Sequence, residues 1–92
     1  MNFITRIELH NATYDNYNQL HRAMENQNFS RLIKSDNGIV YHLPEAEYSC
    51  SNSSIDGVLS AAKIAANSTG CKYLVFTCEW KQWKSEGLIQ AK

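Results

Sequence analysis

The chain begins with a run in which apolar and polar residues alternate. In residues 3–10, one face is mainly apolar and the other carries Ile4, Arg6, Glu8 and His10. Side chains of a strand point alternately to its two faces, so this period of two predicts a strand with one buried and one wetter face. The face expected to be buried consists of Phe3, Thr5, Ile7 and Leu9.

The next stretch, residues 11–28, changes to steps of three and four between its apolar residues. This spacing places them on one face of a helix. Thr13 or Asn11 can cap its start, because a short polar side chain accepts a hydrogen bond from a free backbone N–H. His21 lies at the margin of the buried face, and Arg22 lies outside it. The apolar stripe consists of Tyr14, Tyr17, Leu20 and Met24.

Residues 29–51 are strand-like and contain two places where the chain can turn. The first is the Asp-Asn-Gly within Ser35–Ile39, and the second is the bend at Pro44. The first can be a true hairpin turn or a bulge inside one long bent strand. A four-stranded sheet requires the bulge, with the reversal near Pro44. That arrangement places Leu43 close to Tyr48 across the hairpin.

A second helix is predicted over residues 53–70, with a stripe of apolar residues and small alanines that allow close approach to a sheet. Gly70 is a suitable residue just beyond its end. The last strand, residues 71–80, is apolar on both faces. The polar tail from about residue 84 is either a helical turn or a loose end.

The predicted order is β-α-β-β-α-β in a single domain of residues 1–92. Two split βαβ units with both helices on one face give a ferredoxin-like α+β sandwich with a four-stranded antiparallel sheet. Right-handed crossovers place the first and third strands in the middle of the sheet. The other sheet face stays open, and its mixture of apolar and charged residues suits a partner subunit or RNA.

Composition narrows the classes of partner. The 92 residues include nine Lys and Arg and nine Asp and Glu, so the formal net charge is zero. A protein that coats nucleic acid draws on a basic excess to neutralise phosphates, so this class is disfavoured. A small basic patch on one face remains open.

The sequence also lacks the usual signals for export, for a membrane span, and for binding of a nucleotide or a metal ion. No run is long and apolar enough for a signal segment or a bilayer span, so we expect a cytoplasmic protein that does not enter a membrane. No phosphate-binding glycine motif is present, and we expect no nucleotide or other small-molecule cofactor. The cysteines lack metal-ligand spacing, so we expect reduced thiols and no metal site. They are Cys50, Cys71 and Cys78.

Cleavage of RNA without a metal requires a base for the 2′-hydroxyl proton, an acid for the leaving oxygen and a cation for the phosphate. The candidate catalytic residues are His21, Arg22 and His42; each also fits an ordinary packing or surface role. Trp80 and Trp83 can stack on bases, or pack under the tail or against another chain. The candidate RNA-binding residues are Arg6, His10, Arg31 and Tyr41.

The run NFSRLIKSDNGIVYHLPEAEY, Asn28–Tyr48, resembles the GhoS family of antitoxin endoribonucleases from type V toxin–antitoxin systems. The resemblance extends through nearly the whole chain in element order. It implies a ferredoxin-like fold related to the CRISPR adaptation nucleases, and a bacterial cytoplasmic protein able to form a homodimer. The implied activity is cleavage of a toxin messenger RNA, with no nucleotide or redox cofactor.

The same resemblance directs attention to particular residues. The family carries arginine on the first helix where this chain has LHRAM, which points to His21 and Arg22. The related CRISPR nucleases use an aspartate where His10 ends the first strand, so the resemblance implies no metal there. The alternative hypothesis is a non-catalytic dimeric module that binds or regulates another protein.

Overall fold

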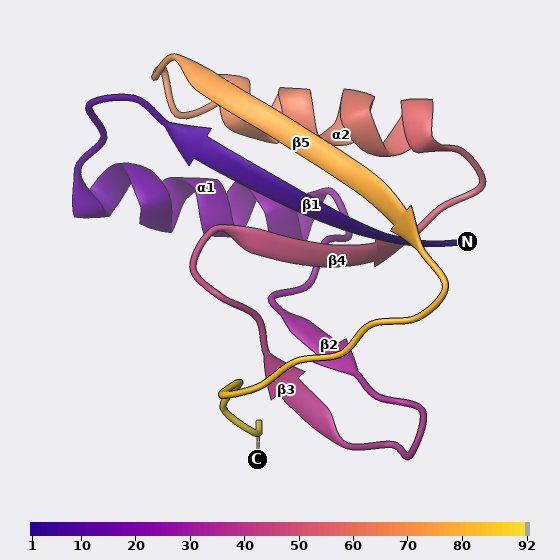
Figure 1. Cartoon of the computed structure of the whole chain (residues 1–92). Coiled ribbons are helices and arrows are strands. Elements are labelled where there is room, and N and C mark those ends of the chain that lie inside the picture. The colour runs from indigo at the N-terminus through magenta and orange to yellow at the C-terminus, as the bar shows by residue number, and fades with distance from the viewer. Residues whose placement is uncertain (92) are drawn as a thin grey trace.

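The computed structural model describes residues 1–91, and within that range it contains five strands and two helices (Figure 1). In chain order these elements are β1 (Asn2–Leu9), α1 (Tyr14–Asn26), β2 (Leu32–Lys34), β3 (Val40–His42), β4 (Glu47–Ser51), α2 (Ile55–Asn67) and β5 (Tyr73–Trp80).

The main sheet is antiparallel, with the strand order β4-β1-β5. Both helices lie on one side of it, behind the strands as drawn in Figure 1. The α+β class and the central position of β1 agree with the sequence prediction. The first strand lies in the middle because the chain pairs with one side of it as β4 and, after α2, with the other side as β5.

The four-stranded sheet is where the structure differs from the prediction. β2 and β3 form a separate two-stranded hairpin. Ser30, just before β2, exchanges two backbone hydrogen bonds with Ser49 of β4, at 2.8 and 2.7 Å. Ser49 also donates its hydroxyl to the carbonyl of Leu32. Pairing with β4 therefore stops almost where the additional strand would begin, and the chain turns away from the main sheet.

Ser35–Ile39 is a true turn, so the bulge interpretation was wrong. The N–H of Ser35 donates to the carbonyl of Ile39 at 2.8 Å, and Gly38 closes the turn with φ +87°. Glycine takes this left-handed conformation without a side-chain clash, and the Asn-Gly sequence favours a tight reversal over a continuous strand. The second bend is also present, with the N–H of Glu47 donating to the carbonyl of Pro44.

Because both bends reverse the chain, Leu43 does not pair with Tyr48. Leu43 instead donates its N–H to the carbonyl of Arg31, at 2.8 Å, across the β2–β3 hairpin. Tyr48 is opposite Thr5 in the main sheet.

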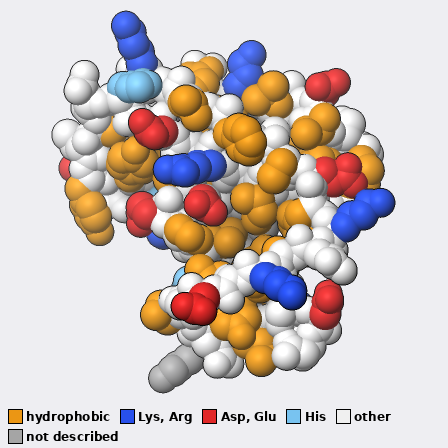
Figure 2. Space-filling view, viewed as in Figure 1, with side chains coloured by type: hydrophobic (Ala, Val, Ile, Leu, Met, Phe, Trp, Pro, Cys, Tyr) orange, Lys and Arg blue, Asp and Glu red, His pale blue; other side chains and the backbone are white. Residues whose placement is uncertain are grey.

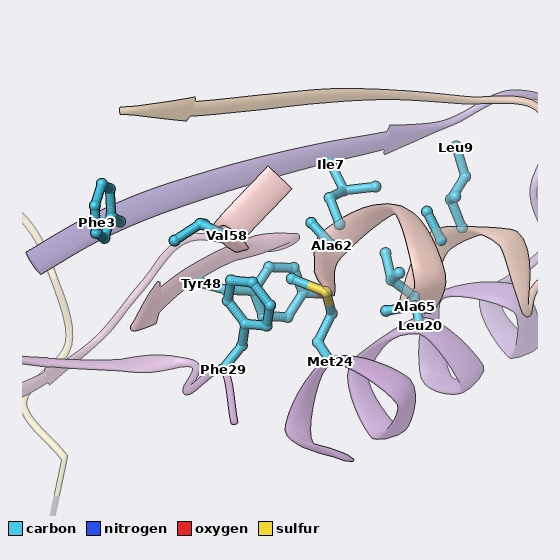
Figure 3. Close-up of a cluster of buried hydrophobic side chains, with 11 residues drawn as sticks. Phe3, Ile7, Leu9, Leu20, Met24, Phe29, Tyr48, Val58, Ala62 and Ala65 are labelled. Atoms are coloured by element: carbon cyan, nitrogen blue, oxygen red, sulfur yellow. The ribbon is translucent and has the colours of Figure 1, made fainter. Parts of the chain in front are cut away.

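The core forms between the sheet and the two helices (Figure 3). The predicted buried face of β1 is confirmed, including Thr5, whose hydroxyl donates to that of Thr77. Thr13 caps α1 as expected, in a reciprocal arrangement with Asn16. Tyr14 was wrongly placed in the core: it is the first residue of α1 and is 81% exposed.

The tail is held against β3. The N–H of His42 donates to the carbonyl of Ile89, and the N–H of Ala91 donates to the carbonyl of Val40, both at 2.8 Å. These bonds flank a short antiparallel bridge between Tyr41 and Gln90, which adds the tail to the β2–β3 hairpin. The tail crosses β3 in the lower part of Figure 1. Within residues 1–91, neither helix has the length and apolar character needed to cross a membrane.

Candidate functional site

Four polar side chains form one continuous line, which we call the polar chain: Tyr48, His21, Glu45 and Arg31. The Tyr48 hydroxyl lies 2.7 Å from Nδ1 of His21, and Nε2 of His21 lies 2.6 Å from Oε1 of Glu45. Oε2 of the same carboxylate lies 3.4 Å from a guanidinium nitrogen of Arg31. The contact between Arg31 and Glu45 is the only ion pair of a Lys or Arg with an Asp or Glu among residues 1–91.

Three parts of the fold bring the polar chain together. His21 projects from the middle of α1 toward the bend that precedes β4. Glu45 occupies that bend, where Ala46 takes a positive φ of 62° and redirects the backbone into the strand. Tyr48 lies in β4 and packs edge-on against Phe29, and both residues are labelled in Figure 3.

Both ring nitrogens of His21 have a hydrogen-bond partner. Burial raises the pKa of the Tyr48 hydroxyl above its usual range, so this group keeps its proton at neutral pH. A neutral His21 then satisfies every partner: Nδ1 accepts from the Tyr48 hydroxyl, and the N–H at Nε2 donates to Glu45. Because both ring nitrogens are engaged, His21 orients the Glu45 carboxylate.

Exposure divides the polar chain into an inner and an outer half. The side chain of His21 is 10% exposed, whereas those of Arg31 and Glu45 are 41% and 66% exposed. A molecule arriving from solvent therefore meets a carboxylate and a guanidinium side by side. The carboxylate can accept a proton or a hydrogen bond from a hydroxyl, and the guanidinium can donate to a phosphate.

The three predicted catalytic residues are not gathered in one place. Arg22 follows His21 on α1 but is exposed, on a different side of the helix. His42 is exposed on β3 and has no side-chain hydrogen bond within residues 1–91. The polar chain instead joins His21 to Arg31, which was predicted to bind RNA, and to Glu45 and Tyr48, which sequence reasoning missed.

No local pattern identifies Glu45 or Tyr48 as partners of His21. They follow it by 24 and 27 positions, and the pairing depends on how α1 packs against the bend before β4. The available signal was the bend itself: a carboxylate beside the proline and an aromatic hydroxyl three residues later in the strand.

Two of the predicted RNA-binding residues lie on the open face of the main sheet. Arg6 is opposite Glu47 on one side and Phe76 on the other, and His10 is exposed just beyond β1. Figure 2 shows hydrophobic side chains spread across this face, with positive and negative charges between them. A shallow hollow of about 490 Å³ there is lined by Ile4, Arg6, Glu8, Glu47, Leu74, Phe76 and Cys78.

The fourth predicted RNA-binding residue, Tyr41, lines a groove between the β2–β3 turn and the segment after β5. Its ring packs edge-on against Trp83, with 6.1 Å between ring centres. Trp80 borders the same groove, and its indole N–H is buried without a hydrogen-bond partner within residues 1–91. The groove has a volume of about 650 Å³ and also carries Lys81 and Lys84. It offers flat aromatic surfaces beside two cations.

Metal-ligating residues do not converge within residues 1–91: no three His, Cys, Asp or Glu side chains there are placed to hold an ion. The three cysteines are free thiols. Cys78 is exposed on the open sheet face, whereas Cys50 and Cys71 are partly buried.

The thiols should differ in reactivity. Burial raises the pKa of Cys50, which lowers the fraction of nucleophilic thiolate at neutral pH. We expect iodoacetamide to modify exposed Cys78 first and Cys50 last, as followed by peptide mass spectrometry. Modification of the urea-unfolded chain is the control and should remove the order; Cys50 reacting first in the folded protein would contradict this environment.

Fold and site together define a small α+β protein with an open sheet face and a solvent-reaching Tyr–His–Glu–Arg chain. Comparison with models of protein families, with curated proteins and with solved structures finds no match. The GhoS-like family therefore stays a prediction based on the residues of Asn28–Tyr48.

Proposed function

We propose that this is an antitoxin-like RNA-binding protein that cleaves a toxin messenger RNA without a metal ion. The observation that carries the proposal is the contact of Glu45 with both His21 and Arg31, which places a base beside a cation. The resemblance supports the same function. Arg31, Glu45 and Tyr48 all fall within Asn28–Tyr48, the stretch in which it is strongest.

In this proposal Glu45 is the general base. Its carboxylate takes the proton of a ribose 2′-hydroxyl, and the 2′ oxygen attacks the adjacent phosphorus. Arg31 donates hydrogen bonds to the phosphate oxygens, where negative charge increases in the transition state. The bond to the 5′ oxygen breaks, and that oxygen takes a proton from water. The products are a 2′,3′-cyclic phosphate and a 5′-hydroxyl.

His21 and Tyr48 are positioning residues in this mechanism. His21 holds the Glu45 carboxylate through its N–H, and Tyr48 keeps the histidine ring in the tautomer that can donate.

We further propose that the fold is a variant of the ferredoxin-like sandwich with a reduced second strand. The order β5-β1-β4, followed by the Ser30–Ser49 pair, supports this arrangement. In this interpretation the hairpin β2–β3 replaces most of one edge strand. Arg31 immediately precedes this hairpin, and Glu45 follows it in the bend before β4.

The experiment that tests the function uses the purified protein and a mixed pool of transcripts in EDTA, with new 5′ ends mapped by sequencing. We expect site-selective cuts with the wild-type chain. Transcripts that stay intact in EDTA and also with added Mg²⁺ would overturn the nuclease proposal and favour a non-catalytic binding module.

The aromatic groove is proposed to hold unpaired bases of the same RNA. Stacking on an aromatic side chain contributes about 1–3 kcal/mol per base, so Trp83→Ala should weaken RNA binding by roughly tenfold. Fluorescence anisotropy with a labelled single-stranded RNA measures the change. Trp83→Phe keeps a stacking ring and should retain most of the affinity. Equal affinity of Trp83→Ala and the wild type would remove the groove from the RNA-binding surface.

A further inference from the structure

β5 has the composition of an interior strand but lies at the edge of the sheet. Within residues 1–91 it pairs with β1 alone. Its outward-facing side chains include Leu74, 50% exposed, and Phe76, 62% exposed. Its other face, packed on α2, is also apolar, and Tyr73 and Val75 there are only partly buried. A long, exposed, hydrophobic edge strand is a ready template for pairing with another chain.

The free edge of β5 also lacks the features that normally prevent strand pairing. Such features are proline, lysine within the strand, bulges, or a covering segment. β5 runs for eight residues without proline, and its single charged residue is Glu79 near the end. Figure 1 shows α2 behind β5, on the helix-covered side of the sheet.

The hydrogen-bonding groups on this edge can be assigned from the alternation of an antiparallel strand. The carbonyl of Lys72 accepts from the N–H of His10, at 2.8 Å, so the main-chain groups of even-numbered residues point toward β1. Those of the odd-numbered residues point away from it. The free edge therefore presents the N–H and C=O groups of Tyr73, Val75, Thr77 and Glu79.

We propose that the free edge of β5 pairs with β5 of a second copy of this chain, in antiparallel orientation, to give a continuous six-stranded sheet. This proposal goes beyond RNA cleavage and does not depend on it.

One register satisfies all the free groups at once. It places Phe76 directly opposite Phe76 of the second copy, so that Tyr73 faces Glu79 and Val75 faces Thr77. All N–H and C=O groups on the free edge then have partners. Sliding the copies by two residues in either direction leaves the groups of Tyr73 or of Glu79 beyond the end of the opposing strand.

Side-chain contacts favour the same register. Phe76 and its copy form a non-hydrogen-bonded pair, in which side chains of antiparallel strands approach most closely, and two aromatic rings there attract each other. Leu74 lies opposite Cys78 of the second copy on the same face. No like charges face each other along the strand, because Glu79 is opposite Tyr73.

The register makes a prediction that can be read by cross-linking. With Leu74→Cys, the new thiol and native Cys78 are four residues apart in one strand, roughly 13 Å, too far for a disulfide within the chain. Across the proposed interface they are directly opposite. Mild oxidation should therefore give a covalent dimer, and peptide mapping should show a bond between positions 74 and 78 of different chains. Leu74→Cys combined with Cys78→Ser is the matched control and should form much less of it.

Light scattering over a concentration series measures the association itself. Wild-type protein should reach the mass of a dimer, and Phe76→Glu should raise the dissociation constant by roughly tenfold or more, because two carboxylates would face each other. Phe76→Glu mixed with Phe76→Lys should restore a dimer. Ile89→Glu, on the exposed tail beside β3, changes the same kind of residue away from this edge and should leave association unchanged.

Several outcomes would overturn the proposal. A wild-type monomer at the highest soluble concentration would do so, as would a dimer that Phe76→Glu leaves intact. A 74–74 or 78–78 cross-link in place of the 74–78 bond would also contradict the register. A stable monomer whose β5 amides become protected from hydrogen exchange only when a peptide of another protein is added would assign the edge to that partner. None of these experiments measures RNA cleavage. A negative result would therefore overturn the proposed dimer and leave the nuclease proposal untouched.

Discussion

Glu45→Gln is expected to slow RNA cleavage by about 100-fold while leaving the fold intact. In the wild type, Nε2 of His21 lies 2.6 Å from Oε1 of Glu45. Glutamine preserves the size of the side chain, and its amide oxygen can still accept a hydrogen bond from His21. It cannot accept a proton from a 2′-hydroxyl. Loss of a general base typically costs a factor of 10² to 10⁴, and initial rates on a single cleaved transcript measure the effect.

The matched control for this substitution is Glu47→Gln. This substitution removes the same charge two residues away. Glu47 lies on the open sheet face opposite Arg6 and outside the polar chain. Its cleavage rate should stay within a factor of two or three of the wild type, the usual range for a distant surface change. Equal rates for Glu45→Gln and the wild type would remove Glu45 from the mechanism.

Leu20→Ala is expected to lower the free energy of unfolding by about 3 kcal/mol. Leu20 is fully buried between α1 and the rest of the core, and replacement of a buried leucine by alanine loses both transfer free energy and packing. For a domain of this size, that loss corresponds to a fall in Tm of roughly 12–24 °C. Urea denaturation followed by circular dichroism measures the change.

Tyr14→Ala provides the comparison, because the sequence places Tyr14 and Leu20 in the same apolar stripe. Tyr14 is 81% exposed, so its loss should change the free energy of unfolding by less than about 0.5 kcal/mol. Similar losses for the two variants would contradict the observed position of the first turn of α1.

The elements of the main sheet and both helices follow closely from the sequence. The period of two over residues 3–10 identified the buried face of β1, because one side of that strand packs against helices and the other remains open. Of the two caps that the sequence offered, Thr13 and Asn11, the structure uses Thr13, whose hydroxyl satisfies a backbone N–H that the helix itself cannot. These signals are local, and the structure preserves them.

The hairpin could not be inferred in the same way. Asn-Gly at positions 37–38 indicated a tight turn, but the expectation of a single four-stranded sheet gave more weight to the global pattern than to this local signal. The predicted order, with the first and third strands in the middle, left the last strand at an edge, and β5 is at an edge of the main sheet with its second flank free within residues 1–91. A strand that is completed by another copy carries the same pattern as one completed within its own chain.

The candidate site was predictable only in part. His21 and Arg31 were selected by residue type, since imidazole and guanidinium groups are common where RNA is bound or cut. Glu45 could not be selected, because its contact with His21 joins a helix to a bend 24 residues later. Tertiary packing of α1 against the start of β4 creates that contact, and neither segment encodes it alone.

The most direct test of the central claim is cleavage of one short RNA in EDTA, compared with the same RNA carrying a single 2′-deoxyribose at the cleaved position. The mechanism predicts a 2′,3′-cyclic phosphate and a 5′-hydroxyl from the first substrate and no cut in the second, since the attacking oxygen is missing. Cleavage of both substrates at equal rates, or products that carry a 5′-phosphate, would contradict it.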